Sequence, residues 1–145
     1  MKKIIIFNLF FVFILIVLFE IILRTIFNIN VQGISKNLLN KNLNYTFNQP
    51  NLKNGLAFGA KVYTDENGLR TLEVKNYKKD AKDVFFIGGS VTFGPAVKAE
   101  KTFVEKLNNE SDLNVLNASA FGSQIKNHYK ILKNLDLSKT DKVFI

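Results

Sequence analysis

Residues 86–94 read Phe-Ile-Gly-Gly-Ser-Val-Thr-Phe-Gly, and their residue types could support chemistry better than any other stretch of this chain. They end a short apolar run that is typical of a buried strand. The two glycines let the backbone turn sharply and leave the hydroxyl of Ser90 exposed at the edge of a sheet. Such a hydroxyl becomes a nucleophile when a base accepts its proton. The segment therefore predicts Ser90 as a candidate nucleophile.

Three common site patterns do not fit this segment. A phosphate-binding loop needs Lys and then Ser or Thr after its last glycine, whereas Pro95 and Ala96 follow Gly94. The spacing does not supply the dinucleotide pattern Gly-x-Gly-x-x-Gly. The Gly-x-Ser-x-Gly elbow requires a glycine where Thr92 stands. We therefore expect neither a nucleotide loop nor that elbow.

The composition excludes several other kinds of site. Without cysteine, the chain has no disulfide scaffold, thiol nucleophile or cysteine-ligated metal. His128 is the single histidine, and we expect neither a metal nor a cofactor. The net charge is +8, but the lysines are scattered in sequence, without a basic helix face. Nucleic-acid binding is therefore not expected; the charge suits anionic envelope polymers or lipid headgroups, or is a solvated surface.

Regular elements surround the serine segment. Apolar runs predict strands, and apolar residues at helical spacing predict helices whose inner faces carry Phe103, Val104 and Leu107 or Ile125, Tyr129, Leu132 and Leu135. The alternation of strand and helix is typical of a parallel sheet with ligands at its carboxyl edge. Upstream, two short strands are expected about an Asp-Glu-Asn-Gly turn. In chain order, the ranges are 56–74 for this pair, then 83–90, 99–110, 113–119, 122–135 and 141–145.

The N-terminus predicts a membrane anchor. Residues 4–23 are nearly all Ile, Leu, Phe and Val, and twenty helical residues span about 30 Å, the thickness of a bilayer core. Lys2 and Lys3 precede the run and Arg24 alone follows it closely, which favours a cytoplasmic N-terminus and an extracytoplasmic remainder. A cleaved signal peptide is the alternative, although the run is long and no Ala-x-Ala-like site follows. We therefore expect a single-pass protein of the inner (cytoplasmic) membrane.

Three regions follow from these patterns. Residues 1–24 form the anchor, residues 25–56 an irregular juxtamembrane linker rich in Asn and Lys, and residues 57–145 an α/β domain. The last predicted strand lacks a following loop, and the domain is short for this architecture. We expect it to be the front portion of a larger domain.

Residues 87–107 resemble block I of the SGNH hydrolases, also called the GDSL esterase/lipase family. Many members read Gly-Asp-Ser-x-Thr-x-Gly there, and this chain keeps Ser90, Thr92 and Gly94. Gly89 replaces the aspartate, as in membrane-anchored relatives that read Gly-Gly-Ser. Residues 114–127 are similar to block II, whose glycine corresponds to Gly122. The stretch from Asn67 to Arg70 is similar to an Asn-x-x-Gly-x-Arg motif upstream of block I, with a shorter spacing.

The resemblance implies a fold and a mechanism. The fold is a flavodoxin-like three-layer sheet, incomplete here. Ser90 would attack an ester carbonyl, with the amides of Ser90 and Gly122 in the oxyanion hole. Gly89, Thr92, Gly94 and Asn117 would support the site; Asn117 either orients the serine loop or only ends its strand. Substrates of the family include O-acetyl groups on envelope carbohydrates or lipids.

The same resemblance shows what these residues lack. An asparagine of block III and the histidine of an Asp-x-x-His motif complete the family's site, and neither motif is found here. His128 is a poor substitute, because Ile125 stands where that motif has its aspartate. We expect the 145 residues alone to be inactive or nearly so. Two alternatives stay open: a non-catalytic relative that binds envelope glycans, and a truncated product without its own function.

Overall fold

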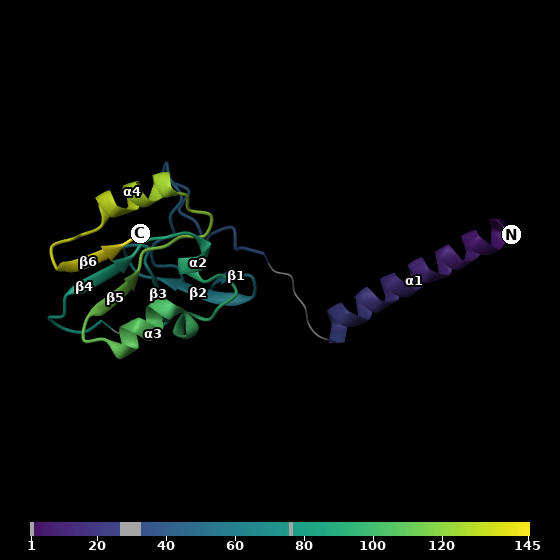
Figure 1. Ribbon diagram of the computed structural model, residues 1–145, viewed down its shortest axis with the longest axis horizontal. Coiled ribbons are helices and arrows are strands. Elements are labelled where there is room, and N and C mark those ends of the chain that lie inside the picture. Colours follow the sequence, from purple (N-terminus) through teal and green to yellow (C-terminus); the bar gives the residue numbers. More distant parts are fainter. Residues whose placement is uncertain (1, 27–32, 76) are drawn as a thin grey trace. The chain divides into compact units, whose positions relative to one another are not determined.

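A computed structural model describes residues 2–26, 33–75 and 77–145 of the chain. The chain divides into two units, residues 1–31 and residues 32–145, which are described separately (Figure 1). In the first unit, the described residues form one helix. The second unit is a mixed α/β fold with a six-stranded sheet.

The first unit contains α1, which runs over Lys2–Ile26. Within it, the stretch Ile4–Leu23 has a mean hydropathy of 3.0, and none of it is buried against the rest of the protein. Isoleucine, leucine, phenylalanine and valine side chains project on every side, so no polar face interrupts the apolar surface. By length and composition, α1 is able to cross a membrane.

The second unit is built on one mixed sheet in the order β1-β2-β3-β5-β4-β6. Strands β5, β4 and β6 are parallel to one another, whereas β1, β2 and β3 add to β5 in antiparallel fashion. The parallel part arises from strand–helix–strand connections, whereas short turns join β1 to β2 and β2 to β3. The strands are β1 (Gly55–Ala57), β2 (Ala60–Thr64), β3 (Arg70–Thr71), β4 (Asp83–Phe86), β5 (Asn114–Asn117) and β6 (Thr140–Phe144).

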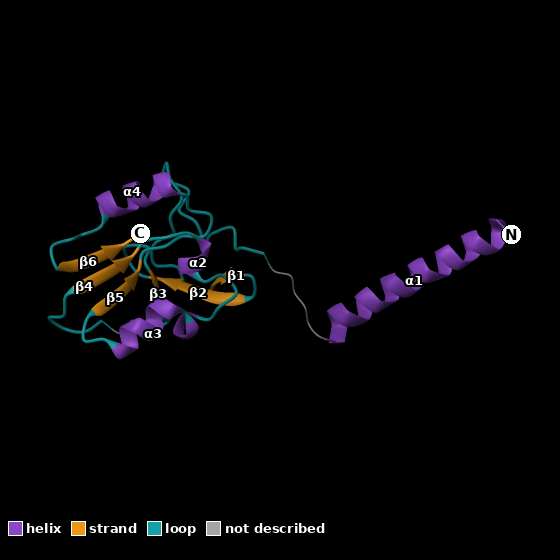
Figure 2. Cartoon of the chain, in the orientation of Figure 1, coloured by secondary structure: helices purple, strands orange, loops and turns teal. Residues whose placement is uncertain are grey.

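Helices cover both faces of the parallel strands. After β4 come the short helix α2 (Ser90–Phe93), a 3₁₀ turn (Ala99–Lys101) and α3 (Phe103–Glu110), and α4 (Ile125–Asn134) connects β5 to β6. Helices α3 and α4 lie on opposite sides of the sheet (Figure 2). On the α4 side, Ile131 packs with Phe85 and Leu116 in one apolar cluster. The parallel strands therefore form the middle one of three layers, with helices on either side.

Part of the range expected as a juxtamembrane linker packs into the core of the second unit. Residues 27–32 lie outside the described residues, while residues 33–56 belong to the second unit. This stretch is largely irregular, yet Leu38 is fully buried, and Phe47 and Leu52 also lie in apolar clusters with sheet residues. Asn48 is fully buried too, and its side-chain amide donates to the carbonyls of Gly68 and Ser119 at 3.0 and 2.9 Å. Side chains with no apolar periodicity thus complete the core.

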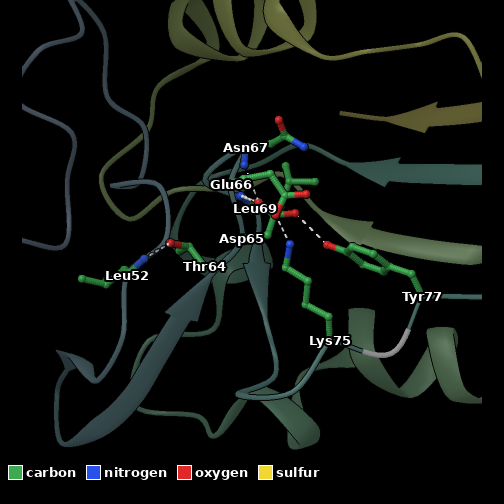
Figure 3. Close-up of polar contacts among 8 residues, drawn as sticks. All are labelled: Leu52, Thr64, Asp65, Glu66, Asn67, Leu69, Lys75 and Tyr77. Atoms are coloured by element: carbon green, nitrogen blue, oxygen red, sulfur yellow. Dashed lines mark hydrogen bonds and ion pairs between the residues drawn. The ribbon is translucent and has the colours of Figure 1, made fainter.

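The turn between β2 and β3 is organised by a buried carboxylate (Figure 3). Asp65 is 1% exposed, and its Oδ1 accepts the backbone amides of Asn67 and Leu69 at 2.9 and 2.8 Å. Its Oδ2 accepts the hydroxyl of Tyr77 at 2.6 Å. Burial, and then this hydrogen bond, raise the pKa of Tyr77 well above its ordinary value. Asp65 thereby fixes the start of β3.

The Tyr77 hydroxyl gives a pH-dependent test of this turn. We expect Tyr77→Phe to lower the free energy of unfolding by about 1 kcal/mol at neutral pH, because one hydrogen bond to a buried carboxylate is lost. Above about pH 10, an unfolded tyrosine ionises while folded Tyr77 keeps its proton, so wild-type stability falls as pH rises. Urea unfolding in detergent should show the difference between wild type and variant shrinking over that range. A difference that is constant with pH would contradict the assignment.

Candidate functional site

Ser90 lies where the sequence predicts it, directly beyond the carboxyl end of β4. The chain leaves the strand through Ile87, Gly88 and Gly89, and Ser90 is the first residue of α2. Its side chain is exposed, and among the residues that the structure describes its hydroxyl has no hydrogen-bond partner. The Ser90 carbonyl accepts the amide of Gly94 at 2.8 Å, and Gly94 adopts the left-handed conformation that ends α2. The hydroxyl is therefore presented on a single tight helical turn.

A second loop runs beside this one from the neighbouring strand β5. Its Ala118 and Ala120 amides donate to the carbonyls of Phe86 and Gly88, at 2.9 and 3.1 Å. The pairing of β4 and β5 thus continues past the ends of both strands. The two loops stay close farther on, because a Cβ atom added to Gly89 would lie 3.1 Å from the carbonyl oxygen of Ser123. The segments that carry Ser90 and Gly122 therefore lie side by side at the carboxyl edge.

Gly122 occupies an open position in the second loop. Its φ is +73°, in the left-handed region that favours glycine, and a Cβ added there would meet nothing within 4 Å. Within the described part of the chain, its amide makes no backbone hydrogen bond. The adjacent Ser123 amide, by contrast, donates to Ala120 at 3.2 Å. An exposed, unengaged amide of this kind can donate to an anionic oxygen.

Asn117, the last residue of β5, connects the two loops through its side chain. It is 5% exposed at the end of β5, and its Nδ2 donates to the carbonyl of Thr92 at 3.1 Å. Its Oδ1 accepts the backbone amide of Ser119 at 3.2 Å and also the Ser119 hydroxyl. Asn117 is thus the last residue of β5, and it is hydrogen-bonded to the segment that carries Ser90.

Arg70 holds the other side of the same segment. Its guanidinium donates to the carbonyls of Phe93, Gly94 and Val97, the second at 2.7 Å, and lies 4.6 Å from the Phe93 ring centroid. Arg70 is 5% exposed, and burial lowers its pKa to about 10, against the opposing effect of Glu100. It therefore stays protonated at neutral pH. A planar donor with several N–H groups suits three converging carbonyls.

Arg70 is the residue whose role the sequence did not reveal. The sequence placed it only in a stretch that is similar to a motif upstream of block I. The structure pairs it with Asn117 across β3 and β5, so that both side chains reach the end of α2. The local sequence, Gly-Leu-Arg-Thr-Leu-Glu, gives no signal of this role, because the carbonyls that Arg70 contacts lie 23 to 27 residues farther along the chain.

The backbone geometry also accounts for the glycines before Ser90. A Cβ on Gly88 would lie 2.7 Å from the Cβ of Thr92, too close for any side chain. Gly89 is less constrained, because its added Cβ would meet only the Ser123 carbonyl. Gly88 is thus required by α2 itself, whereas Gly89 serves the approach of the neighbouring loop.

Within the described part of the chain, no base contacts the serine. His128 is in the first turns of α4, and its Nε2 is enclosed without a hydrogen-bond partner among the described residues. No hydrogen bond joins His128 to Ser90. The same residues contain no cluster of three or more His, Asp or Glu side chains able to hold a metal ion. The arrangement thus offers a nucleophile and an amide donor, without the group that would activate the nucleophile.

A separate cavity of about 860 Å³ extends from the amino ends of β4 and β5 along the α4 side of the sheet. Asp83 and Asn114, the first residues of β4 and β5, both line it. Its apolar lining comes from residues such as Phe47 and Ile131, and its polar lining from asparagine, lysine and aspartate side chains. Neither Ser90 nor Gly122 lines this cavity, so it is distinct from the serine site.

The comparisons with known proteins leave the family open. No protein-family model matches the chain, and a search of curated proteins finds no significant match.

Replacing Arg70 tests its role in holding α2. We expect Arg70→Met to lower the free energy of unfolding by about 3 kcal/mol, because several charge-assisted hydrogen bonds to buried carbonyls are lost. Arg70→Lys should fall in between, since an ammonium lacks the planar donor geometry. Lys75→Met is the control, because the Lys75–Glu66 ion pair is solvent-exposed. Urea unfolding in detergent measures all three. Equal losses for Arg70→Met and Lys75→Met would contradict this role.

The two glycines give a paired test of the loop geometry. Gly88→Ala should destabilise the fold by about 2 kcal/mol or more, because its Cβ overlaps Thr92. Gly89→Ala should have a smaller effect, because the Ser123 carbonyl has only to shift by a few tenths of an ångström. Thermal unfolding compares the two variants. If Gly89→Ala were the more destabilising change, the described packing of these loops would be wrong.

Proposed function

We propose that this protein is a membrane-anchored serine ester hydrolase or acyltransferase of the SGNH type, with Ser90 as its nucleophile. The observation that carries the proposal is the pairing of the two loops beyond β4 and β5. This pairing brings an unengaged hydroxyl and an unengaged amide, those of Ser90 and Gly122, to the same edge of the sheet. Acyl transfer needs these two groups together, one to attack and one to stabilise the resulting oxyanion.

The topology supports the same assignment. The order β5-β4-β6, with all three strands parallel and helices on both faces, agrees with the centre of a flavodoxin-like sheet. The central strand β4 delivers Ser90, and its neighbour β5 delivers Gly122. In this interpretation the antiparallel strands β1 to β3 are an addition that supplies Arg70.

In the proposed reaction, the Ser90 Oγ attacks the carbonyl carbon of an ester, and the serine proton passes to a base. The tetrahedral oxyanion accepts the amides of Ser90 and Gly122, each worth about 3 kcal/mol of barrier when well placed. The alcohol then leaves with a proton, and an acyl-serine remains. Water returns the acid in a hydrolase, whereas a second alcohol accepts the acyl group in a transferase. Asn117 and Arg70 act as positioning residues.

In the SGNH hydrolases that the sequence resembles, the base is the histidine of an Asp-x-x-His motif. An asparagine of block III is the third oxyanion donor in that family. His128 fits this role poorly, because its Nε2 is enclosed while the Ser90 hydroxyl is exposed. Gly89, in place of the family's aspartate, is consistent with the close approach of Ser123. The aspartate would place its Cβ against that carbonyl.

The proposed location follows from α1. A helix able to span a membrane, with Lys2 and Lys3 before the apolar run, favours an N-terminus in the cytoplasm. The second unit would then lie outside the cytoplasmic membrane. Acylated carbohydrates or lipids of the cell envelope are the esters available there, and we propose them as substrates.

The separate cavity beside α4 supports a second candidate function, which is the binding of a glycan without catalysis. Carbohydrates are recognised by planar polar groups and aromatic rings, and a cavity of about 860 Å³ has the size of a ligand site. Side chains of both kinds line it, namely Asn40, Tyr45, Asn67, Tyr77 and Asn134.

Hydrolysis of p-nitrophenyl acetate tests the first function. We expect Ser90→Ala to lower turnover by about 10³-fold or more, because the nucleophile is lost. Ser111→Ala, at the end of α3, is the control and should keep wild-type turnover. Equal turnover in wild type and Ser90→Ala would exclude Ser90 from the mechanism. Absence of turnover in the wild type, with glycan binding that Asn67→Ala weakens, would favour the second function instead.

A further inference from the structure

The outer face of α4 is basic, although the lysines look scattered in the sequence. Lys126, Lys130 and Lys133 follow the helix at intervals of four and three residues, and all three are exposed. No acidic residue occurs within Ile125–Asn134. Side chains at this spacing lie on one side of a helix. Three positive charges are therefore gathered on one exposed helical surface.

Large apolar side chains accompany these lysines. Ile125 is 81% exposed and Tyr129 is 68% exposed, whereas Asn127 and Ile131 face the interior. The sequence predicted Ile125 and Tyr129 on the inner face; the structure places them outside. Ile125 and Tyr129 are four residues apart, and they lie next to the lysines. The surface thus combines positive charge with an aliphatic and an aromatic side chain.

We propose that the outer face of α4, defined by Ile125, Lys126, Tyr129, Lys130 and Lys133, binds the surface of an anionic lipid bilayer. Lysines beside a bilayer are attracted to anionic headgroups, and an isoleucine and a tyrosine between them can enter the headgroup region. Ile131 holds the inner face of α4 against the sheet, which leaves this outer face for the bilayer.

The chain itself supplies the reason why a weak contact is enough. If α1 spans the membrane, the second unit is tethered to the bilayer and meets it at high effective concentration. Lysines near an anionic surface contribute favourably one by one, and salt screens this contribution. The inference rests on α1 as a membrane span and does not depend on the chemistry of Ser90.

Docking through α4 has a consequence for the serine site. Helix α4 begins two residues after Ser123, whose carbonyl lies beside Gly89. An α4 face seated on headgroups therefore brings the loop that contains Gly122 close to the lipid surface. If the proposed function holds, the esters reached most directly are those of lipids or of lipid-linked carbohydrates.

Single-cysteine labelling tests the docking, because the chain contains no cysteine. An environment-sensitive fluorophore is attached to Tyr129→Cys on α4 or to Leu107→Cys on α3, which is 42% exposed in the wild type. The full chain is placed in nanodiscs of phosphatidylcholine, with or without phosphatidylglycerol. We expect a blue shift at position 129 only when phosphatidylglycerol is present, its reversal by high salt, and no lipid-dependent change at position 107.

Charge-reversal variants give the matched control. Lys126→Glu with Lys133→Glu should abolish the shift at position 129, whereas Lys101→Glu with Lys106→Glu makes the same charge change near α3 and should preserve it. Both pairs are exposed, so neither change disturbs the core. The proposal is overturned if both labels respond alike, if the response ignores lipid charge, or if both variant pairs abolish it. It is also overturned if added DNA, and not the anionic lipid, produces the shift. None of these measurements involves turnover, so their outcome is separable from that of the esterase test.

Discussion

Three consecutive backbone carbonyls at the end of α2 are the constraint on which the serine loop depends. A helix of four residues cannot satisfy its own terminal carbonyls, so these carbonyls need donors from other elements. Asn117 donates to the carbonyl of Thr92, and Arg70 to those of Phe93 and Gly94. Since Arg70 and Asn117 are register partners in the sheet, the loop is held by the sheet itself.

This arrangement explains the unusual connection between the two halves of the sheet. Strand β3 has only two residues, and it pairs with β5 through the single register position of Arg70 and Asn117. A strand of this length stabilises little by its ladder. What β3 contributes is the buried guanidinium of Arg70. The hydrogen bonds of Asp65 fix the start of β3 and thereby the position of Arg70. The antiparallel extension and the serine loop are therefore parts of one polar network around an apolar core.

The apolar runs at β4 and β5 carried enough information to predict the parallel strands and the place of Ser90. The helical faces were harder, because spacing does not distinguish an inner apolar side chain from an outer one. Phe103 and Leu107 are about four-tenths exposed, while Asn108 is buried and its Oδ1 accepts the amide of Val115 at 3.0 Å. A polar residue that satisfies a strand amide can displace an apolar one from the inner face. The packed segment 33–56 and the carbonyl contacts of Arg70 depend on long-range contacts, which no local pattern reveals.

The two edge strands of the sheet, β1 and β6, differ in what lies beside them. On one side, Ala57 of β1 forms an isolated bridge with Ile34, so residues 33–56 partly shield that border. On the other side, β4 is the one strand that pairs with β6 among the residues that the structure describes. The outward backbone groups of β6 form a template to which a strand of another molecule can add. Asp141 and Lys142 are exposed along it, and charged side chains of this kind oppose aggregation by strand addition.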